Sequence, residues 1–133
     1  MRCPQEREPN GGWSAVTVAT VLLARRDLPA VYAGGVAGAV LRALAGEAFP
    51  HEVGAFAWST LLANVAGAAL LGWVATRFPP ETWQRPLLGS GFCGALTTFS
   101  TLQLELLRMP PATAVAYAAV TVLAGLAAVT VTR

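Results

Sequence analysis

The chain has 133 residues, of which 55% are hydrophobic and only 12% are charged, and its formal net charge is +2. A soluble domain carries charge on about a quarter of its residues, so the composition excludes that class and predicts an all-α membrane protein. The single histidine, His51, falls in a loop. A histidine-based metal or nucleophilic site therefore has nothing to build on, and an enzyme is not expected.

Residues 1–27 are expected to form an N-terminal extension. Residues 1–12 are polar, and residues 13–24 form a short apolar stretch that ends at Arg25, Arg26 and Asp27. A bilayer core needs about 20 apolar residues per helix, so this stretch is too short to span it. We expect an interfacial helix or an extension of the first span, rather than a cleaved signal peptide.

Residues 28–133 contain four long apolar runs and are predicted to form one membrane domain. The transmembrane helices are expected at about 28–46, 54–76, 86–104 and 112–132. Their connections are short, so consecutive helices should run antiparallel, and both ends of the domain should lie on the same side. Small residues recur at helical spacing, as at Gly34 and Gly38, and such faces let helices approach closely in lipid.

Few polar residues remain within or next to the spans, and each has two interpretations. Asn64, in the second span, is either a hydrogen-bonding contact between helices or part of a ligand site. Arg42 either extends its charge to the interface or places positive charge in a vestibule that attracts anions. Glu105 is an interfacial residue or an acceptor for Arg42 or for a nearby hydroxyl. Tyr117 shares one face of the fourth span with two threonines, and this face could line a polar track.

The third span contains the most informative segment. Four hydroxyl residues surround Phe99: Thr97, Thr98, Ser100 and Thr101. Hydroxyl side chains offer the backbone alternatives to the helical hydrogen-bond ladder, so a break in this helix is plausible. Irregular backbone at membrane depth survives only where protein or a wet cavity satisfies it. The ring of Phe99 either packs against a neighbour or presents its positive edge to an anion.

Three motifs occur in a fixed order: residues 34–42 (GGVAGAVLR), 60–67 (TLLANVAG) and 91–101 (GFCGALTTFST), the last followed by Glu105. With these motifs the chain resembles the Fluc family of small fluoride channels, also called the CrcB family. The resemblance covers about residues 28–133. It implies an antiparallel dimer with two narrow fluoride pores and a third helix broken at residues 97–101. It also implies a structural sodium ion at the dimer centre, held by backbone carbonyls near Gly94, Thr97 and Thr98.

The resemblance assigns roles to individual residues of this chain. Arg42 corresponds to the family's vestibule arginine and Glu105 to the acidic residue after the break. The expected fluoride path is lined by Asn64, Phe99, Ser100, Thr101, Leu102 and Tyr117. The implied function is passive, fluoride-selective export across the cell membrane, which gives fluoride resistance. The alternatives are a proton-coupled small-multidrug-type exporter, which needs an intramembrane carboxylate, and a non-conducting membrane assembly subunit.

Two features of the sequence depart from the family pattern. Leu102 stands where the family commonly has a second phenylalanine, and leucine lacks the positive ring edge. The positive charge is also uneven: Arg108 lies on one side, against Arg25, Arg26, Arg77, Arg85 and Arg133 on the side of the termini. That bias favours a single orientation with cytoplasmic termini. We therefore expect either a homodimer or, with slight preference, a heterodimer with an oppositely oriented homologue that supplies the missing ring.

Overall fold

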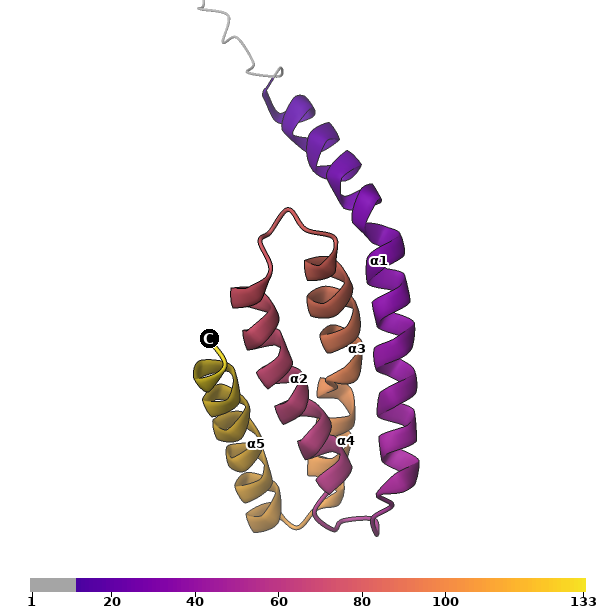
Figure 1. Cartoon of the computed structure of the whole chain (residues 1–133). Helices are drawn as coiled ribbons and strands as arrows, with labels where there is room; N and C mark the ends of the chain where they lie inside the picture. Colours follow the sequence, from indigo (N-terminus) through magenta and orange to yellow (C-terminus); the bar gives the residue numbers. More distant parts are fainter. Residues whose placement is uncertain (1–11) are drawn as a thin grey trace, which may run out of the picture.

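The computed structural model describes residues 12–133, with side chains from Asp27 onward. Within that range all regular structure is helical, which confirms the predicted all-α class. The elements are α1 (Gly12–Ala48), α2 (Trp58–Arg77), the π-helix η1 (Pro86–Cys93), α3 (Gly94–Leu96), α4 (Phe99–Arg108) and α5 (Pro111–Val131) (Figure 1). Three stretches are long and apolar enough to cross a membrane: Asp27–Ala48 within α1, α2 and α5.

The first helix extends beyond the first predicted span, residues 28–46. α1 is continuous over 37 residues, which at 1.5 Å per residue is about 55 Å, well beyond a bilayer core of roughly 30 Å. Residues 12–27 thus continue the first predicted span as one helix instead of forming a separate element. The polar residues 1–11 lie outside the described part of the chain.

The helices alternate in direction, so that the start of α1 and the C-terminus lie at the same end of the bundle (Figure 1). α1 packs mainly along η1 and α3, whereas α2 packs on α5. The third predicted span is thus built from η1, α3 and α4 in succession. None of these three helices alone is long enough to span a membrane, so this segment is not confirmed as one of the four predicted transmembrane helices.

Glycines allow α1 to approach η1 closely. A methyl group added at Gly34 would collide with the carbonyl oxygen of Leu87, and one added at Gly38 would collide with that of Phe92. The neighbouring Gly35 has open space around the same position. The small residues recognised at helical spacing in the first span therefore lie at a backbone-to-backbone contact, as expected for helices that associate in lipid.

The second helix starts later than predicted. It begins at Trp58 and not at residue 54, because Gly54 has a positive φ of 85° and forms a turn in which the Ala55 amide donates to the Glu52 carbonyl oxygen at 3.0 Å. This combination is typical of a type II turn with glycine at its third position. The second apolar run includes Gly54, but this residue belongs to the turn that precedes α2.

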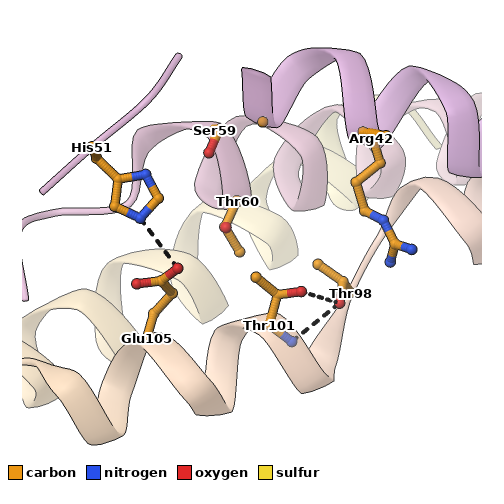
Figure 2. Close-up of a pocket in the computed structure, with 9 residues that line it drawn as sticks. Arg42, His51, Ser59, Thr60, Thr98, Thr101 and Glu105 are labelled. Atoms are coloured by element: carbon orange, nitrogen blue, oxygen red, sulfur yellow. Dashed lines mark hydrogen bonds and ion pairs between the residues drawn. The ribbon is translucent and has the colours of Figure 1, made fainter. Parts of the chain in front are cut away.

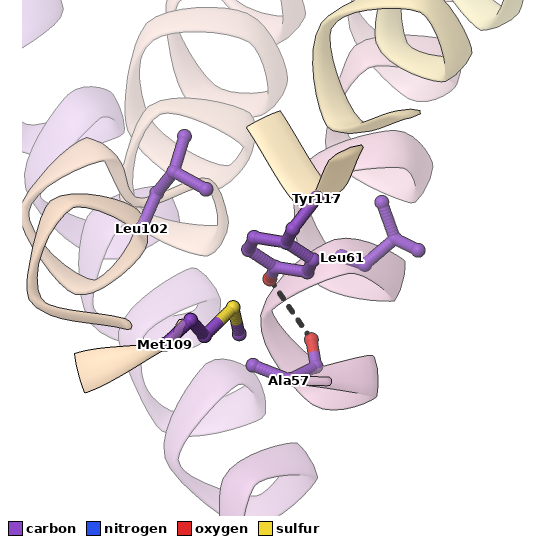
Figure 3. Packing of buried hydrophobic residues seen from close by; sticks show 5 residues of the cluster. All are labelled: Ala57, Leu61, Leu102, Met109 and Tyr117. Atoms are coloured by element: carbon purple, nitrogen blue, oxygen red, sulfur yellow. Dashed lines mark hydrogen bonds between the residues drawn. The ribbon is translucent and has the colours of Figure 1, made fainter. Parts of the chain in front are cut away.

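A cluster of buried hydrophobic residues lies at the end of the bundle that contains this turn. The buried members come from the residue before α2, from α2, α4 and α5 and from the α4–α5 connection: Ala57, Leu61, Leu102, Met109 and Tyr117 (Figure 3). The Tyr117 hydroxyl donates a hydrogen bond to the Ala57 carbonyl oxygen at 3.0 Å, and the Phe56 ring meets the Tyr117 ring edge-on at 4.7 Å. These contacts fix the α1–α2 connection to α5.

Candidate functional site

Two residues with extended backbone, Thr97 and Thr98, separate α3 from α4, with ψ angles of 150° and 121°. The Thr98 hydroxyl accepts a hydrogen bond from the Thr101 amide at 3.2 Å and so caps the start of α4. Because this cap restarts the helix at Phe99, the interruption is narrower than the 97–101 segment expected from the resemblance.

The side chain of Asn64, on α2, fills the gap in the backbone ladder. Its Oδ1 accepts from the Thr98 amide at 2.7 Å, and its Nδ2 donates to the Thr98 carbonyl oxygen at 3.2 Å. Asn64 is therefore a contact between helices, one of its two interpretations from sequence. An asparagine amide carries two N–H donors, and the second has no partner among the described residues.

The interruption also frees backbone carbonyl groups. In a continuous helix the amide of Thr98 would bond to the carbonyl of Gly94, and the amide of Thr101 to that of Thr97. Here these amides donate to Asn64 Oδ1 and to the Thr98 hydroxyl. The carbonyls of Gly94 and Thr97 thus lose their helical donors.

Carbonyl oxygens released in this way are ligands suited to a hard cation such as sodium. The Thr98 carbonyl accepts from Asn64 and, as the N-cap residue of α4, also accepts the first hydrogen bond of that helix, so it has no lone pair left for an ion. Within the described residues no three His, Cys, Asp or Glu side chains gather to hold a metal, so a cation at the interruption depends on backbone oxygens. Of the expected donor set near Gly94, Thr97 and Thr98, the freed carbonyls of Gly94 and Thr97 therefore fit sodium chemically.

A cavity of about 280 Å³, which we call the Glu105 cavity, lies between α1, the start of α2 and α4. Its lining is mostly polar side chains: Arg42, Ala43, Gly46, His51, Ser59, Thr60, Thr98, Thr101 and Glu105 (Figure 2). It brings together Arg42, Thr101 and Glu105, three residues singled out from the sequence.

Glu105 is buried in this cavity and is paired with His51. The Oε1 atom of Glu105 lies 3.1 Å from Nε2 of His51, and the two side chains are 9% and 24% exposed. Figure 2 shows Arg42 at the opposite end of the cavity from His51. Sequence reasoning considered Arg42 or a hydroxyl as the partner of Glu105 and missed His51. The signal was topological, because the end of the first span and the end of the third lie on the same side of an antiparallel bundle.

A second cavity of about 230 Å³, the Asn64 cavity, is lined by Asn64, Thr97, Thr98, Phe99 and Leu102. Thr98 lines both cavities. The Phe99 side chain is largely uncovered, with 70% of the residue exposed, so its ring is not used for packing within this chain. Ser100 is also exposed, and its hydroxyl lies 3.3 Å from that of Thr98.

Tyr117 is placed differently from the other predicted path residues. It is fully buried, its hydroxyl donates to Ala57, and its carbonyl accepts from the Thr121 hydroxyl at 2.8 Å. It lines neither the Glu105 cavity nor the Asn64 cavity. Leu102 has two roles, because it borders the Asn64 cavity and also packs in the cluster of Figure 3.

Comparison with known proteins adds a second line of information. The family described as CrcB-like protein, Camphor Resistance (CrcB), matches residues 29–133. The chain is similar to fluoride-specific ion channel FluC 1 of Mycobacterium bovis, with 44% identity over 112 residues that cover 78% of this chain and 85% of the relative. It is also similar to fluoride-specific ion channel FluC of Methanopyrus kandleri, with 39% identity over 118 residues, or 82% and 88% of the two chains.

Proposed function

Because the chain belongs to the CrcB family, we propose that it is a fluoride-selective channel through which fluoride leaves the cell passively. The chain is a multi-pass protein of the cell membrane. Its relatives are named ion channels, a class distinct from enzymes, and their names do not favour the proton-coupled exporter or the non-conducting subunit.

The observation that carries this proposal is the pair of cavities that meet at Thr98. They present neutral donors to an anion: the unused Nδ2–H of Asn64 and hydroxyls such as that of Thr101. The uncovered ring of Phe99 adds a positive edge. Fluoride is tightly hydrated and sheds its water only where several donors replace it, and conduction also requires that the site release the ion.

Arg42 supports the direction of entry. It lines the Glu105 cavity together with Thr98 (Figure 2), where a fixed positive charge raises the local concentration of anions. In the proposed path fluoride is attracted by Arg42, passes the hydroxyls around Thr98 and reaches Asn64 and Phe99. The ion moves down its electrochemical gradient, which supplies about 2.3 kcal/mol per charge for each 100 mV.

The proposed active form is an antiparallel dimer. The exposed ring of Phe99 and the Asn64 cavity beside it leave a wall to be supplied by a second subunit. A sodium ion at the dimer centre would be held by the freed carbonyls of Gly94 and Thr97. When bound, it supplies positive charge that holds these oxygens together and fixes the interruption.

The identity of the second subunit follows from orientation. The arginine bias and Leu102 support pairing with an oppositely oriented homologue over pairing with a second copy. Co-expression of this chain, differently tagged, with itself and with a homologue from the same genome tests this choice. Recovery of only the mixed dimer is expected, whereas a conducting dimer of two copies would contradict it.

Growth of a bacterial host that lacks its own fluoride exporters tests the proposed function in cells. Expression of the chain with its partner should restore growth in fluoride and leave growth in chloride unchanged. The matched variant Arg42→Gln, which removes the positive charge of the Glu105 cavity, should restore growth less well at equal membrane levels. Failure of the wild-type pair to protect cells would contradict fluoride export.

A further inference from the structure

We propose, on the basis of the fluoride conduction proposed above, that His51 is a positioning residue that sets the net charge of the Glu105 cavity. Protonated His51 neutralises the carboxylate of Glu105 and leaves Arg42 free to attract anions. When His51 is neutral, that carboxylate instead cancels the positive charge of Arg42. Fluoride flux therefore rises as the pH falls.

The contact is specific and the histidine is held in place. His51 Nε2 lies 3.1 Å from Glu105 Oε1, and the Glu105 side chain is 9% exposed. The connection that carries His51 is fixed on its C-terminal side by the turn at Gly54 and by the hydrogen bond from Tyr117 to Ala57. The side chain of His51 is 24% exposed, so protons from the bulk solution reach it.

Few other charges face this pair. α1 contributes Arg42 to the cavity, and the start of α2 contributes only the hydroxyls of Ser59 and Thr60. On α5, the phenol of Tyr117 is engaged with Ala57. The remaining charged side chains nearby in the chain, Glu47 on α1, Glu52 in the connection and Arg108 on α4, are exposed and do not line the cavity.

The balance of charge in the cavity thus depends on His51. Arg42 and Glu105 carry opposite unit charges and cancel, so the lining is neutral when His51 is neutral and carries one positive charge when His51 is protonated. Histidine is the side chain whose charge ordinarily changes between about pH 5 and pH 8. A positive entry cavity raises the rate at which an anion arrives, and salt weakens this effect.

Charge and contact can be separated because a neutral imidazole with its proton on Nε2 still donates to Glu105. A purely structural role for His51 would therefore not make the flux depend on pH. His51→Gln replaces the imidazole with a neutral amide at every pH, whereas His51→Arg supplies a permanent positive charge. Glu52→Gln is a matched control, since it removes a charge from the same connection without touching the cavity.

The test measures the initial fluoride efflux from proteoliposomes that contain this chain co-purified with its oppositely oriented partner. The pH is equal on both sides and is varied from about pH 5.5 to pH 8.5, the range that brackets histidine titration. Protein-free liposomes give the background leak of hydrogen fluoride, which is subtracted. The wild type should conduct several-fold faster at the acidic end, and less so at high salt. His51→Gln should be slow and His51→Arg fast, both without pH dependence, and Glu52→Gln should follow the wild type.

The outcomes also separate the two proposals. A wild type that conducts fluoride at a rate independent of pH, or a His51→Gln variant that keeps the wild-type pH dependence, overturns the role of His51 and leaves the channel intact. Absence of fluoride efflux at every pH from the correctly folded wild-type mixed dimer overturns both. Gel filtration of each variant before reconstitution identifies protein that failed to fold. If the His51→Gln variant does not fold, the pH dependence of efflux through the His51→Arg variant decides the test.

Discussion

Asn64 and Thr98 exchange two hydrogen bonds across the boundary between α2 and the interruption that separates α3 from α4. The Oδ1 atom of Asn64 takes the place of the helical carbonyl that the Thr98 amide lacks. One residue thus fixes the irregular backbone and also lines the Asn64 cavity. If the proposed fluoride path is correct, stability and conduction are therefore coupled at Asn64.

Substitution of Asn64 should affect both properties. Asn64→Ala removes both hydrogen bonds to Thr98, and loss of a partner by a poorly solvated backbone group costs about 1–3 kcal/mol. Thermal unfolding in detergent should shift to lower temperature, and fluoride efflux should fall. Asn64→Asp separates the two roles, because it keeps an acceptor for the Thr98 amide but adds a negative charge that repels fluoride. An Asn64→Asp variant that conducts like the wild type would contradict a place for Asn64 in the fluoride path.

The contact between α1 and η1 gives a second prediction. Gly34→Ala places a methyl group against the Leu87 carbonyl oxygen, whereas Gly35→Ala meets open space. Overpacking of a close contact costs about 1–3 kcal/mol, so Gly34→Ala should lower the unfolding temperature clearly and Gly35→Ala should not. Equal thermal stability of the two variants would show that α1 does not pack on η1 through this face.

Tyr117 offers a test of two roles for one side chain. Tyr117→Phe removes the hydrogen bond to the Ala57 carbonyl oxygen and keeps the ring in the cluster. The Leu61 amide still donates to the Ala57 carbonyl oxygen at 3.1 Å, so the expected loss is that of one ordinary hydrogen bond, about 0.5–1.5 kcal/mol of stability. Selectivity for fluoride over chloride should be unchanged in the protein that remains folded. A change in selectivity at undiminished stability would instead place the Tyr117 hydroxyl in the fluoride path, as the resemblance implied.

Removal of sodium tests the proposed cation. Protein exchanged into choline salts should lose fluoride efflux and dimer stability, and both should return when sodium is added back, because the freed carbonyls of Gly94 and Thr97 repel one another without an ion. Elemental analysis establishes that sodium has been removed. Full activity and full dimer stability in sodium-free protein would contradict the ion.

Much of the architecture was predictable from uncharged runs and small residues. The runs located the α2, η1–α4 and α5 regions to within a few residues at most ends, because lipid demands long apolar helices. The start of α2 was missed, since the apolar pattern does not reveal that Gly54 adopts a positive φ. The short apolar stretch of residues 13–24 fits both an interfacial helix and a continuation of the first span, so the sequence does not distinguish the continuous α1 from a separate helix.

The candidate site was predictable in kind more than in detail. The hydroxyl-rich segment indicated an interruption, and Asn64, Phe99 and Leu102 were expected to lie together, as they do around the Asn64 cavity. Spacing alone could not show that Tyr117 bonds to Ala57. The helical period shows which residues of α5 share one face, but it does not show which part of the chain packs against that face. The pairing of His51 with Glu105 joins residues 54 positions apart, and only the packed connection brings them together.

The most direct measurement is fluoride efflux from liposomes, recorded with a fluoride electrode, with chloride efflux as the control and no pH gradient across the membrane. Two preparations are compared: the chain purified alone, and the chain co-purified with an oppositely oriented homologue. We predict rapid efflux of fluoride but not of chloride from the mixed dimer, without any need for a proton gradient. Absence of fluoride efflux from both folded preparations, or equal efflux of chloride, would contradict a fluoride-selective channel.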